Sequence, residues 1–293
     1  MPDTIILNGK ELAQELNREL AQTIKNSGVT PLLAVITIGD NPASQIYVRN
    51  KRKAAQEVGI ETQEYHLPTE TTQEKVVALI QELNESEKVN AVLLQLPVPE
   101  HLNPSVLIEA ISPQKDVDGL TSYNAGGLVC GRQLFVPCTP RACLYLLNKA
   151  LPSLDGLHAV VLGRSALVGR PLASLLLQQN CTVTLAHSHS RNMSEILPTA
   201  DIIISSVGNP GLLHKADVKA GATIIDVGIN RLPDGKIVGD ILFLEMLGHA
   251  GCVTPVPGGV GPLTVAMLLQ NTWLATQRQR SGNTQITMLK DFS

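Results

Sequence analysis

The stretch that decides the fold is Val160-Val161-Leu162-Gly163-Arg164-Ser165-Ala166-Leu167-Val168-Gly169-Arg170-Pro171. An apolar run meets a turn that contains glycine, and a helical pattern follows. This order predicts a strand, a tight loop and a helix N-terminus, whose backbone N–H groups can hold a pyrophosphate. Five residues separate Gly163 from Gly169, so the spacing departs from the G-x-G-x-x-G pattern of dinucleotide-binding loops. A strand–turn–helix junction without a ligand therefore stays open as the alternative.

The same alternation of strand and helix runs through both halves of the 293-residue chain. We expect strands at residues 32–38, 91–94, 159–162, 182–186, 202–206 and 223–227. We expect helices at residues 104–111, 172–178 and 263–274, and another after the capping box Thr71-x-x-Glu74. The pattern predicts an α/β protein with two domains and mainly parallel sheets, the C-terminal domain being Rossmann-like. Functional groups should then lie beyond the carboxyl ends of the strands.

Composition and charge narrow the class of protein. Hydrophobic residues make up 44% and charged residues 17%, as in a well-packed globular protein. The net charge of −3 and the lack of a basic run argue against nucleic acid as a partner. No apolar run approaches the roughly 20 residues that span a bilayer, the N-terminus has no basic n-region, and the five cysteines form no C-x-x-C pair. We therefore expect a cytoplasmic protein with free thiols, no membrane partner and no metal site.

The end of the strand predicted at residues 182–186 bears on the choice of nucleotide. NAD sites usually place an acidic residue here to bind the ribose 2′-hydroxyl, whereas this chain runs His187-Ser188-His189-Ser190-Arg191. Arg164, Arg191 and the hydroxyl of Ser188 suit a 2′-phosphate, which favours NADP over NAD. A solvated loop remains the alternative for Arg191. We interpret the two histidines as loop residues, because no third metal ligand is evident.

Two further predicted strands end in glycine, within Ser206-Val207-Gly208 and Asp226-Val227-Gly228-Ile229. Glycine lets the backbone approach a flat cofactor ring. A turn that requires glycine is the alternative, and for Gly208 alone it is the preferred interpretation.

Candidate catalytic residues come from the first half of the chain. Tyr47 and Lys51 are four residues apart on one predicted helix and share a face. A lysine among apolar neighbours has its ammonium form disfavoured, which suits proton handling, although such a pair alone is more often a half-buried tyrosine and a surface lysine. Gln95 follows a predicted strand, and Lys115-Asp116-Val117-Asp118-Gly119 is an acidic turn or simply a solvated loop. The loop Pro255–Pro262 is dense in proline and glycine, which indicates a fixed backbone path with a function beyond linking.

Five motifs, in this order, make the chain similar to one enzyme family. They are Tyr47-Val48-Arg49-Asn50-Lys51, Leu93-Leu94-Gln95-Leu96-Pro97, Lys115-Asp116-Val117-Asp118-Gly119-Leu120, Gly163-Arg164-Ser165 with Val168-Gly169, and Pro257-Gly258-Gly259-Val260-Gly261-Pro262. From about Thr4 to Leu274, the chain resembles the bifunctional methylenetetrahydrofolate dehydrogenase/methenyltetrahydrofolate cyclohydrolase family. The resemblance implies a folate-binding and catalytic domain at residues 1–137 and 271–293, an NADP-binding Rossmann-like domain at residues 138–270, and a cleft between them.

The resemblance also implies an activity. The enzyme would oxidise methylenetetrahydrofolate to methenyltetrahydrofolate with NADP and then hydrolyse the product to formyltetrahydrofolate, within one-carbon metabolism and purine biosynthesis. It would be a homodimer. Neither step requires a protein nucleophile or a metal, and the sequence has no G-x-S-x-G element and no zinc-ligand spacing.

The same resemblance implies a role for each candidate residue. Lys51 would be the central catalytic residue and Gln95 would tune and orient it. Tyr47 would pack on the folate ring system, and Asp118 would anchor the pterin. The residues in contact with NADP would be Gly163, Arg164, Ser165, Ser188 and Ile229. The loop of Pro257, Gly258 and Gly259 would border the folate pocket.

Two other interpretations stay open. A different two-domain NADP-dependent dehydrogenase, such as a shikimate dehydrogenase-like enzyme, would leave Gln95, Asp118 and the 257–262 loop unexplained together. A non-catalytic nucleotide-binding protein would be expected to lack Lys51 or Asp118. One departure from the family is Arg141, where glycine usually follows Pro-Cys-Thr-Pro.

Overall fold

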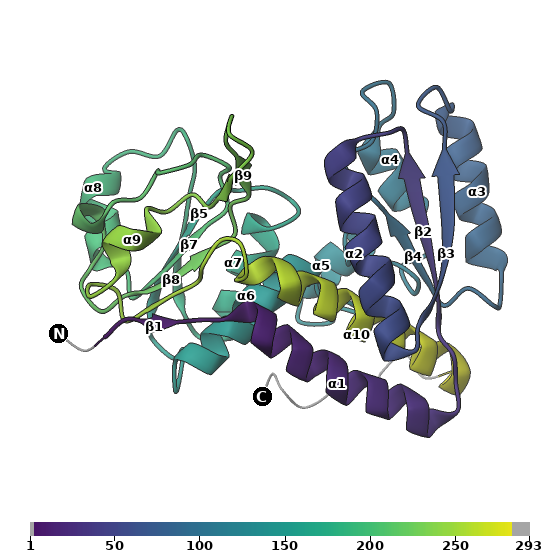
Figure 1. Cartoon of the computed structure of the whole chain (residues 1–293), viewed down its shortest axis with the longest axis horizontal. Coiled ribbons are helices and arrows are strands. Elements are labelled where there is room, and N and C mark those ends of the chain that lie inside the picture. Colours follow the sequence, from purple (N-terminus) through teal and green to yellow (C-terminus); the bar gives the residue numbers. More distant parts are fainter. Residues whose placement is uncertain (1–2, 283–293) are drawn as a thin grey trace. The chain divides into compact units, whose positions relative to one another are not determined.

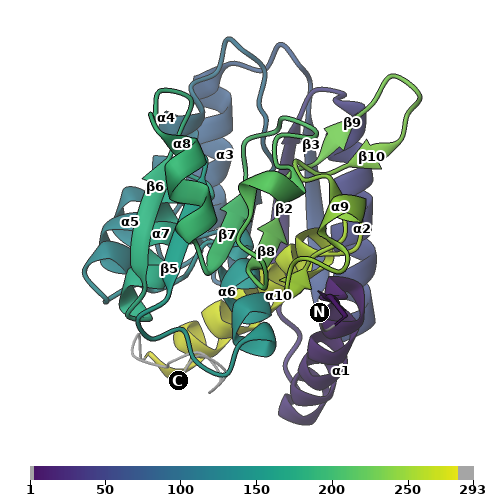
Figure 2. The same cartoon turned by 90° about the vertical axis from the view of Figure 1, so that its left-hand side faces the viewer.

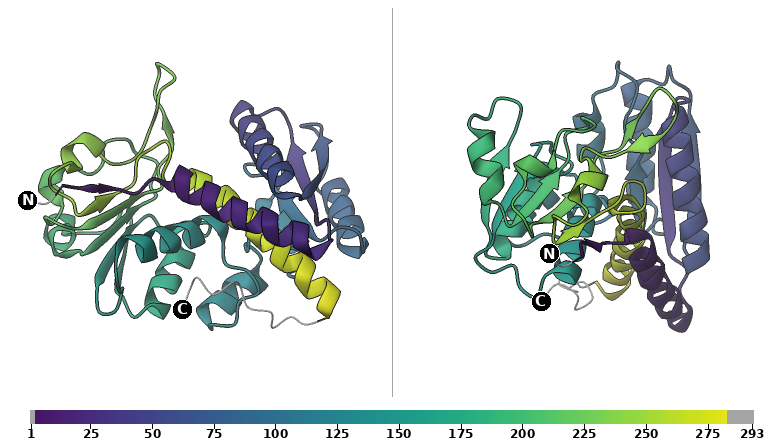
Figure 3. Two further views of the ribbon diagram at one scale, coloured as in Figure 1. Left: turned by 60° about the horizontal axis from the view of Figure 1, so that its bottom comes forward. Right: turned by 60° about the vertical axis from the view of Figure 1, so that its left-hand side comes forward.

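The computed structural model describes residues 3–282, except for the side chains of residues 42–46, and divides the chain into two compact units (Figures 1, 2 and 3). Unit 1 contains the N-terminal segment through Ala13 together with Thr139–Thr264. Unit 2 contains Gln14–Cys138 together with the C-terminal segment from Val265. The helices α1 (Gly9–Ser27) and α10 (Val260–Ser281) each contribute residues to both units.

Unit 2 is built on a three-stranded parallel sheet in the order β3-β2-β4. Its strands are β2 (Leu32–Ile38), β3 (Glu61–Leu67) and β4 (Ala91–Leu94), and its helices include α2 (Pro42–Val58), α3 (Gln73–Glu85), α4 (Pro104–Glu109) and α5 (Ser122–Val129). Figure 1 shows α2 on one side of this sheet and α3 on the other. Because alternate residues of a strand face opposite sides, Ala34 and Ile36 of β2 share one core with Val76 and Ile80 of α3. Cover on both sides explains why β4 is apolar along its whole length.

Unit 1 is built on a six-stranded parallel sheet in the order β1-β11-β8-β7-β5-β6. The strands are β1 (Ile5–Ile6), β5 (His158–Leu162), β6 (Thr182–Ala186), β7 (Ile202–Ser205), β8 (Thr223–Asp226) and β11 (Cys252–Val253), and β9 (Asn230–Arg231) with β10 (Ile237–Val238) forms a separate antiparallel hairpin. The helices are α6 (Cys138–Ala150), α7 (Gly169–Gln178), α8 (Met193–Ile196) and α9 (Phe243–Met246), with 3₁₀ turns η1 (Leu197–Thr199) and η2 (Lys215–Asp217). Val160 and Ile203 share a core with Leu197 and Met246 on one face of the sheet, while α7 lies on the other face (Figure 1).

The predicted fold class is confirmed, since both units have parallel sheets covered by helices. The strands β2, β4 and β6 coincide with their predicted ranges, and β5, β7 and β8 each differ by one residue. The predicted cap at Thr71 is wrong by one residue, because α3 begins at Gln73 with Thr72 as its N-cap. The prediction placed the first residues of the chain in the folate-binding domain at residues 1–137. The structure groups the segment through Ala13 with unit 1 instead, because β1 pairs with β11 far along the chain.

Two observations concern membrane and redox chemistry. No helix within residues 3–282 combines the length and the apolar character that crossing a membrane requires. The thiols of Cys138, Cys143, Cys181 and Cys252 are buried, that of Cys130 is exposed, and none of the five forms a disulfide.

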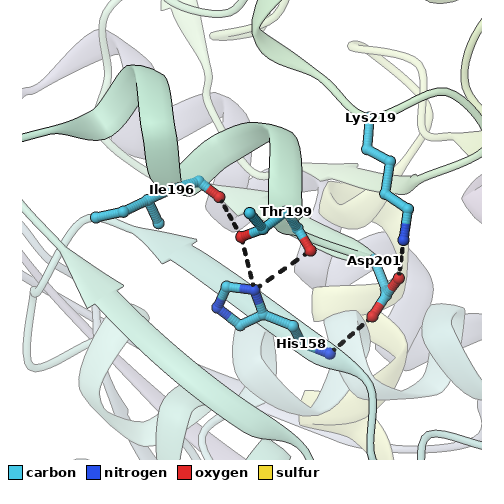
Figure 4. Close-up of polar contacts among 5 residues, drawn as sticks. All are labelled: His158, Ile196, Thr199, Asp201 and Lys219. Atoms are coloured by element: carbon cyan, nitrogen blue, oxygen red, sulfur yellow. Dashed lines mark hydrogen bonds and ion pairs between the residues drawn. The ribbon is translucent and has the colours of Figure 1, made fainter.

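A polar cluster ties together the amino ends of β5, β7 and β8, at the edge of the sheet opposite the glycine-rich loop (Figure 4). The backbone N of His158 donates to Asp201 Oδ2 at 2.9 Å, and Lys219 Nζ donates to Asp201 Oδ1 at 2.5 Å. Thr199 Oγ1 lies 3.2 Å from His158 Nδ1 and donates to the backbone O of Ile196 at 2.7 Å. The hydrogen bonds from Lys219 and His158 hold the pKa of Asp201 below its usual value.

We predict that Asp201→Asn lowers the free energy of unfolding by about 1 kcal/mol near pH 7, because the amide cannot accept from both donors. The folded-state pKa of Asp201 is lower than the unfolded value of about 3.9. The contribution of this carboxylate is therefore present above about pH 4 and is lost as the pH falls through the folded-state pKa. Urea unfolding of both proteins at about pH 7 and about pH 3 measures the difference. A difference of equal size at both pH values would contradict the prediction.

Candidate functional site

A hydrogen bond brings together two of the predicted catalytic residues in unit 2. Lys51 lies on α2, and its Nζ donates to Gln95 Oε1 at 2.9 Å. Gln95 directly follows β4, and its Nε2 donates to the backbone O of Leu96 at 2.7 Å. Its backbone N donates to Ile36 O at 2.9 Å, so both the main chain and the amide of Gln95 are fixed. A neutral amide oxygen can thus orient the lysine without adding a charge beside it.

The environment of Lys51 disfavours the charged form of its side chain. Desolvation by burial lowers the pKa of Lys51, whereas the charges of Asp118 and Cys138 act to raise it. The net effect is a pKa below the usual lysine value, which increases the share of neutral amine at physiological pH. An amine that can exist in both protonation states is suited to general acid–base chemistry.

The segment Lys115–Gly119 runs beside β4 and carries two buried charged residues. Val92 N donates to Lys115 O at 2.8 Å, and Val92 forms a parallel bridge with Asp116. Lys115 is only 8% exposed. Its Nζ donates to the backbone oxygens of Leu83, Asn84 and Ser86 at 2.9, 2.8 and 2.7 Å. These carbonyls end α3, where the helix dipole favours a cation, so the solvated-loop alternative is wrong for Lys115.

Asp116 fixes the backbone that follows it. Its carboxylate is 2% exposed and accepts three hydrogen bonds, from Leu120 N at 3.1 Å, Thr121 N at 2.8 Å and Asn124 Nδ2 at 2.8 Å. Burial raises the pKa of Asp116, and these donors act to lower it. Asn271 Nδ2 donates to Val117 O at 2.7 Å. Asp118 is therefore held on a braced segment, half-buried and close enough to Lys51 to influence its charge.

Tyr47 lies one helical turn before Lys51 on α2 and is half-buried. Burial raises the pKa of its phenol, so the ring is uncharged at physiological pH. A neutral aromatic ring one turn from the lysine can pack against a flat heterocycle.

In unit 1, two glycines shape the loop after β5. Gly163 has a φ of +105°, and a Cβ there would lie 2.6 Å from the backbone O of Ser206. A Cβ at Gly169 would overlap the backbone O of Gly163. The turn and the start of α7 are therefore packed as closely as glycine permits. These are the roles that the first and last glycines play in dinucleotide-binding loops, a tight turn and close helix–strand packing.

Polar and cationic groups gather at the same edge of the sheet. Arg164 and Ser165 are exposed on the loop after β5, and Ser188 and Arg191 are exposed after β6, the neighbouring parallel strand. The segment 187–191 has no carboxylate. Within residues 3–282, no three His, Cys, Asp or Glu side chains are grouped as metal ligands. The edge thus offers hydroxyl and guanidinium donors for an anion beside the tight turn.

The loops after β7 and β8 need glycine for different reasons. Gly208 has a φ of +69°, and a Cβ there would find its nearest neighbour at 3.9 Å, so the turn itself requires glycine. A Cβ at Gly228 would overlap the carboxylate of Asp240. This glycine makes room for a protein side chain, which differs from the predicted close approach to a cofactor ring. Ile229 follows it and is 51% exposed.

The predicted substrate loop lies at the carboxyl end of β11 in unit 1. A Cβ at Gly259 would lie 2.6 Å from Pro255 O, and Gly258 O accepts from Lys10 N at 3.0 Å. The structure therefore groups Pro257, Gly258 and Gly259 with the predicted cofactor residues. Tyr47, Lys51, Gln95 and Asp118 form the second group, in unit 2.

The sequence reasoning missed several residues that hold these groups in place. Lys115 and Asp116 were visible only as part of an acidic turn, and Cys138, whose Sγ lies 3.4 Å from Val117 O, only as part of Pro-Cys-Thr-Pro. No role was predicted for the carboxylates of Asp226 and Asp240, which are buried in the structure. The proximity of Asp116 to predicted strand 91–94 could not be read from spacing, since it depends on a long-range bridge.

The chain matches two models of one protein family. Residues 7–118 match "Tetrahydrofolate dehydrogenase/cyclohydrolase, catalytic domain", and residues 137–280 match "Tetrahydrofolate dehydrogenase/cyclohydrolase, NAD(P)-binding domain". Together the two matches cover most of the 293 residues.

Individual relatives agree with these matches. "Bifunctional protein FolD 2" of Sinorhizobium medicae is 50% identical over 289 residues, which cover 96% of this chain and 97% of the relative. The crystal structure of the bifunctional enzyme FolD, a methylenetetrahydrofolate dehydrogenase/cyclohydrolase from Campylobacter jejuni, is 44% identical with a TM-score of 0.91, covering 94% of this chain and 99% of that one. A Trypanosoma brucei methylenetetrahydrofolate dehydrogenase-cyclohydrolase, crystallised with NADP cofactor and an inhibitor, is 36% identical with a TM-score of 0.90, covering 95% and 99%.

The similarity to shikimate dehydrogenase is confined to the fold. The enzyme from Aquifex aeolicus is 11% identical to this chain with a TM-score of 0.51, covering 89% of this chain and 95% of that one. The alternative of a shikimate dehydrogenase-like enzyme is therefore not favoured.

We predict that Arg164→Gln weakens the binding of NADP⁺ about tenfold and that of NAD⁺ by less than about twofold, because only NADP⁺ carries the 2′-phosphate that a guanidinium binds. Isothermal titration of both nucleotides measures the two dissociation constants. Arg132→Gln, which removes an exposed arginine of unit 2, is the matched control and should change neither. An equal loss for both nucleotides would remove Arg164 from the 2′-phosphate site.

Proposed function

The chain belongs to the tetrahydrofolate dehydrogenase/cyclohydrolase family, and we propose that its folate chemistry is carried by Lys51, Gln95, Tyr47 and Asp118 of unit 2. The protein is an NADP-dependent methylenetetrahydrofolate dehydrogenase and methenyltetrahydrofolate cyclohydrolase. The observation that carries the assignment of roles is the hydrogen bond of 2.9 Å from Lys51 to Gln95, in a setting that lowers the pKa of the lysine.

The loops of unit 1 fit the nicotinamide cofactor. The tight turn at Gly163 and the helix start at Gly169 leave no space for a side chain, so the backbone itself can approach a pyrophosphate. Arg164, Ser165 and Ser188 supply donors for phosphate oxygens, and the exposed side chain of Ile229 supplies an apolar contact. When bound, NADP⁺ accepts a hydride from the methylene carbon of the folate.

In the oxidation step, the residues of unit 2 bind and orient the folate. The carboxylate of Asp118, held by the braced segment at Asp116, accepts hydrogen bonds from the pterin, and Tyr47 packs against its ring. Correct orientation of the reacting carbon converts binding energy into rate. Pro257, Gly258 and Gly259 border the folate in this proposal, where their rigid backbone limits the positions that the ring can take.

In the hydrolysis step, Lys51 handles the protons. A water molecule adds to the methenyl carbon, and the neutral amine of Lys51 accepts the proton that the water loses. The adduct then loses its hydroxyl proton to solvent as the carbonyl forms and one carbon–nitrogen bond breaks. The ammonium of Lys51 returns its proton to the departing nitrogen, so each turnover yields the formyl product and releases one proton. Gln95 directs Nζ through its fixed amide oxygen, and the lowered pKa of Lys51 allows both halves of this cycle near neutral pH.

Two finer points belong to the same proposal. The protein acts on tetrahydrofolate derivatives in the cytoplasm, where the reducing environment agrees with five cysteines that form no disulfide. It acts as a homodimer, and the formyl product serves one-carbon metabolism, including purine biosynthesis.

The proposal is tested with Lys51→Met. We expect hydrolysis of methenyltetrahydrofolate to fall about 100-fold or more, the share that general acid–base catalysis contributes, with NADP⁺ binding unchanged because that site lies in unit 1. Wild type should reduce NADP⁺ with methylenetetrahydrofolate and release formyl product, while the variant should accumulate methenyl product. Absorbance follows both NADPH and the methenyl compound, and chromatography identifies the formyl product.

Lys53→Met is the matched control, since Lys53 is on the same helix and its side chain is 79% exposed. It should keep both activities. Persistent hydrolysis by Lys51→Met would refute the catalytic role of Lys51. A wild-type protein that turns over no folate would refute the proposed function.

The charge of Asp118 provides a pH test. Asp118 acts to raise the pKa of Lys51, so Asp118→Asn should lower that pKa further. The limb of the pH profile of kcat for hydrolysis that reports Lys51 should move to lower pH by roughly one unit. Saturating substrate separates this shift from weaker folate binding. Glu87→Gln, an exposed charge of the same unit, should leave the profile in place, and a profile that moves to higher pH with Asp118→Asn would contradict the assignment.

A further inference from the structure

Asp240 is a fully buried carboxylate that follows the β9–β10 hairpin of unit 1. Its two oxygens accept five hydrogen bonds. Oδ2 accepts from Ser205 Oγ at 2.9 Å, Val207 N at 2.9 Å and Gly208 N at 3.3 Å, and Oδ1 accepts from Asn209 N and Asn230 Nδ2, both at 3.0 Å. Buried carboxylates are stable only when their lone pairs are satisfied, and this one is satisfied by donors from two separate loops.

The donors to Asp240 belong to the loops that leave two neighbouring parallel strands. Residues 207–209 follow β7, and Asn230, the first residue of β9, directly follows the short loop after β8 that contains Ile229. Three consecutive backbone N–H groups of the first loop point at one carboxylate. The side chain of Asn230 connects the second loop to the same group. A single side chain therefore determines where both loops lie.

A second buried carboxylate holds Asp240 in place. Asp226, the last residue of β8, accepts from Asp240 N at 3.1 Å and Ile241 N at 3.0 Å, and also from Gly228 N at 2.9 Å. The fit leaves no space for added atoms, since a Cβ at Gly228 would overlap the carboxylate of Asp240 and a Cβ at Gly239 that of Asp226. The two glycines are thus required by the carboxylates.

The strand order identifies which half of a dinucleotide these loops face. The glycine-rich turn follows β5, which lies between β6 and β7 in the sheet. A pyrophosphate at this turn directs one half of the dinucleotide over β6, where Ser188 and Arg191 suit the 2′-phosphate of the adenosine half. The other half must extend over β7 and β8. The loops held by Asp240 therefore lie where the nicotinamide would be.

We propose that Asp240 is the positioning residue of the nicotinamide half of the cofactor site, because its carboxylate fixes the 207–209 and 228–230 loops against each other. The inference rests on the proposed binding of NADP by unit 1. Asp240 does not touch the cofactor in this proposal and acts through the loops. An amide at this position would replace one of the two accepting oxygens with an NH₂ group that faces N–H donors. The isosteric Asp240→Asn therefore disrupts the positioning of the loops with little change in volume.

The test separates the two halves of the cofactor by using two ligands. The dissociation constants of NADP⁺ and of 2′-phospho-ADP-ribose, which lacks the nicotinamide ring, are measured by isothermal titration for wild type and Asp240→Asn. We expect NADP⁺ to bind about tenfold more weakly to the variant, a loss of about 1.4 kcal/mol, and 2′-phospho-ADP-ribose to bind within about twofold of wild type. Hydrolysis of methenyltetrahydrofolate without nucleotide should be retained, since Lys51 and Gln95, which handle its protons in the proposal, lie in unit 2.

Asp234→Asn is the matched control, because Asp234 is exposed on the same hairpin and its Asn replacement still accepts from Lys236 N. It should match wild type in every assay. Equal weakening of both ligands, loss of nucleotide-free hydrolysis, or unchanged NADP⁺ binding in Asp240→Asn would overturn the proposal. If Asp240→Asn does not fold, Asn230→Ser, which removes one donor, decides: selective weakening of NADP⁺ supports the proposal and unchanged binding overturns it.

The wild-type protein separates this inference from the function on which it rests. If wild type hydrolyses methenyltetrahydrofolate but binds no NADP⁺, the cofactor assignment fails and the role of Asp240 fails with it. If wild type binds and reduces NADP⁺ while Asp240→Asn behaves identically, only the role of Asp240 fails.

Discussion

Parallel strand pairing is the constraint on which the rest of the structure depends. In the main sheet of each unit the strands run in one direction, so every loop that leaves a carboxyl end of such a strand starts at the same edge of the sheet. Gln95 leaves β4 at this edge in unit 2, and Gly163 and Gly228 leave β5 and β8 at this edge in unit 1. Because the central strands β2, β4, β5, β7 and β8 are largely buried, their register is strongly specified, and the starts of the loops after them are placed by the core before any ligand binds.

Buried charged residues then hold in place the loops whose starting points the sheets determine. Lys115 donates to three carbonyls at the end of α3, and Asp116 and Asp240 accept from backbone and side-chain donors of the segments around them. A buried charge without such partners costs several kcal/mol, so each of these groups enforces one arrangement of its surroundings. Asp118 gains its position from Asp116, and the exposed Ile229 gains its position from the loop that Asn230 and Asp240 secure.

The sequence predicted features that depend on neighbouring residues, but it did not predict contacts between residues far apart in the chain. The longer buried strands were found because their apolar runs are continuous. The edge strand β3 was missed because it has no apolar run: its residues are exposed or half-buried and mostly polar. The buried strand β11 was missed because it is only two residues long. The pair of Tyr47 and Lys51 followed from helix periodicity, which depends on neighbours in the chain. The carboxylate of Asp240 lies more than thirty residues from Ser205, whose hydroxyl it binds, and no spacing rule connects them. The burial of Lys115 and Asp116 could not be predicted either, because an acidic turn is ordinarily solvated and the partners of both residues lie elsewhere in the chain.

In the proposed hydrolysis, the hydrogen-bond partner of Lys51 explains how one side chain would serve both as base and as acid. A carboxylate in hydrogen-bond contact would stabilise the ammonium and raise the pKa of the lysine, which would withhold the neutral amine that water must reach. Gln95 occupies that contact instead, and its neutral oxygen aligns Nζ without fixing the proton there. The charge of Asp118 opposes the desolvation that lowers the pKa of Lys51 without making the dominant contribution. The amide of Gln95 sets the orientation of Lys51 Nζ, whereas burial and the charge of Asp118 set the proton affinity of the amine. The two properties are therefore set by different groups.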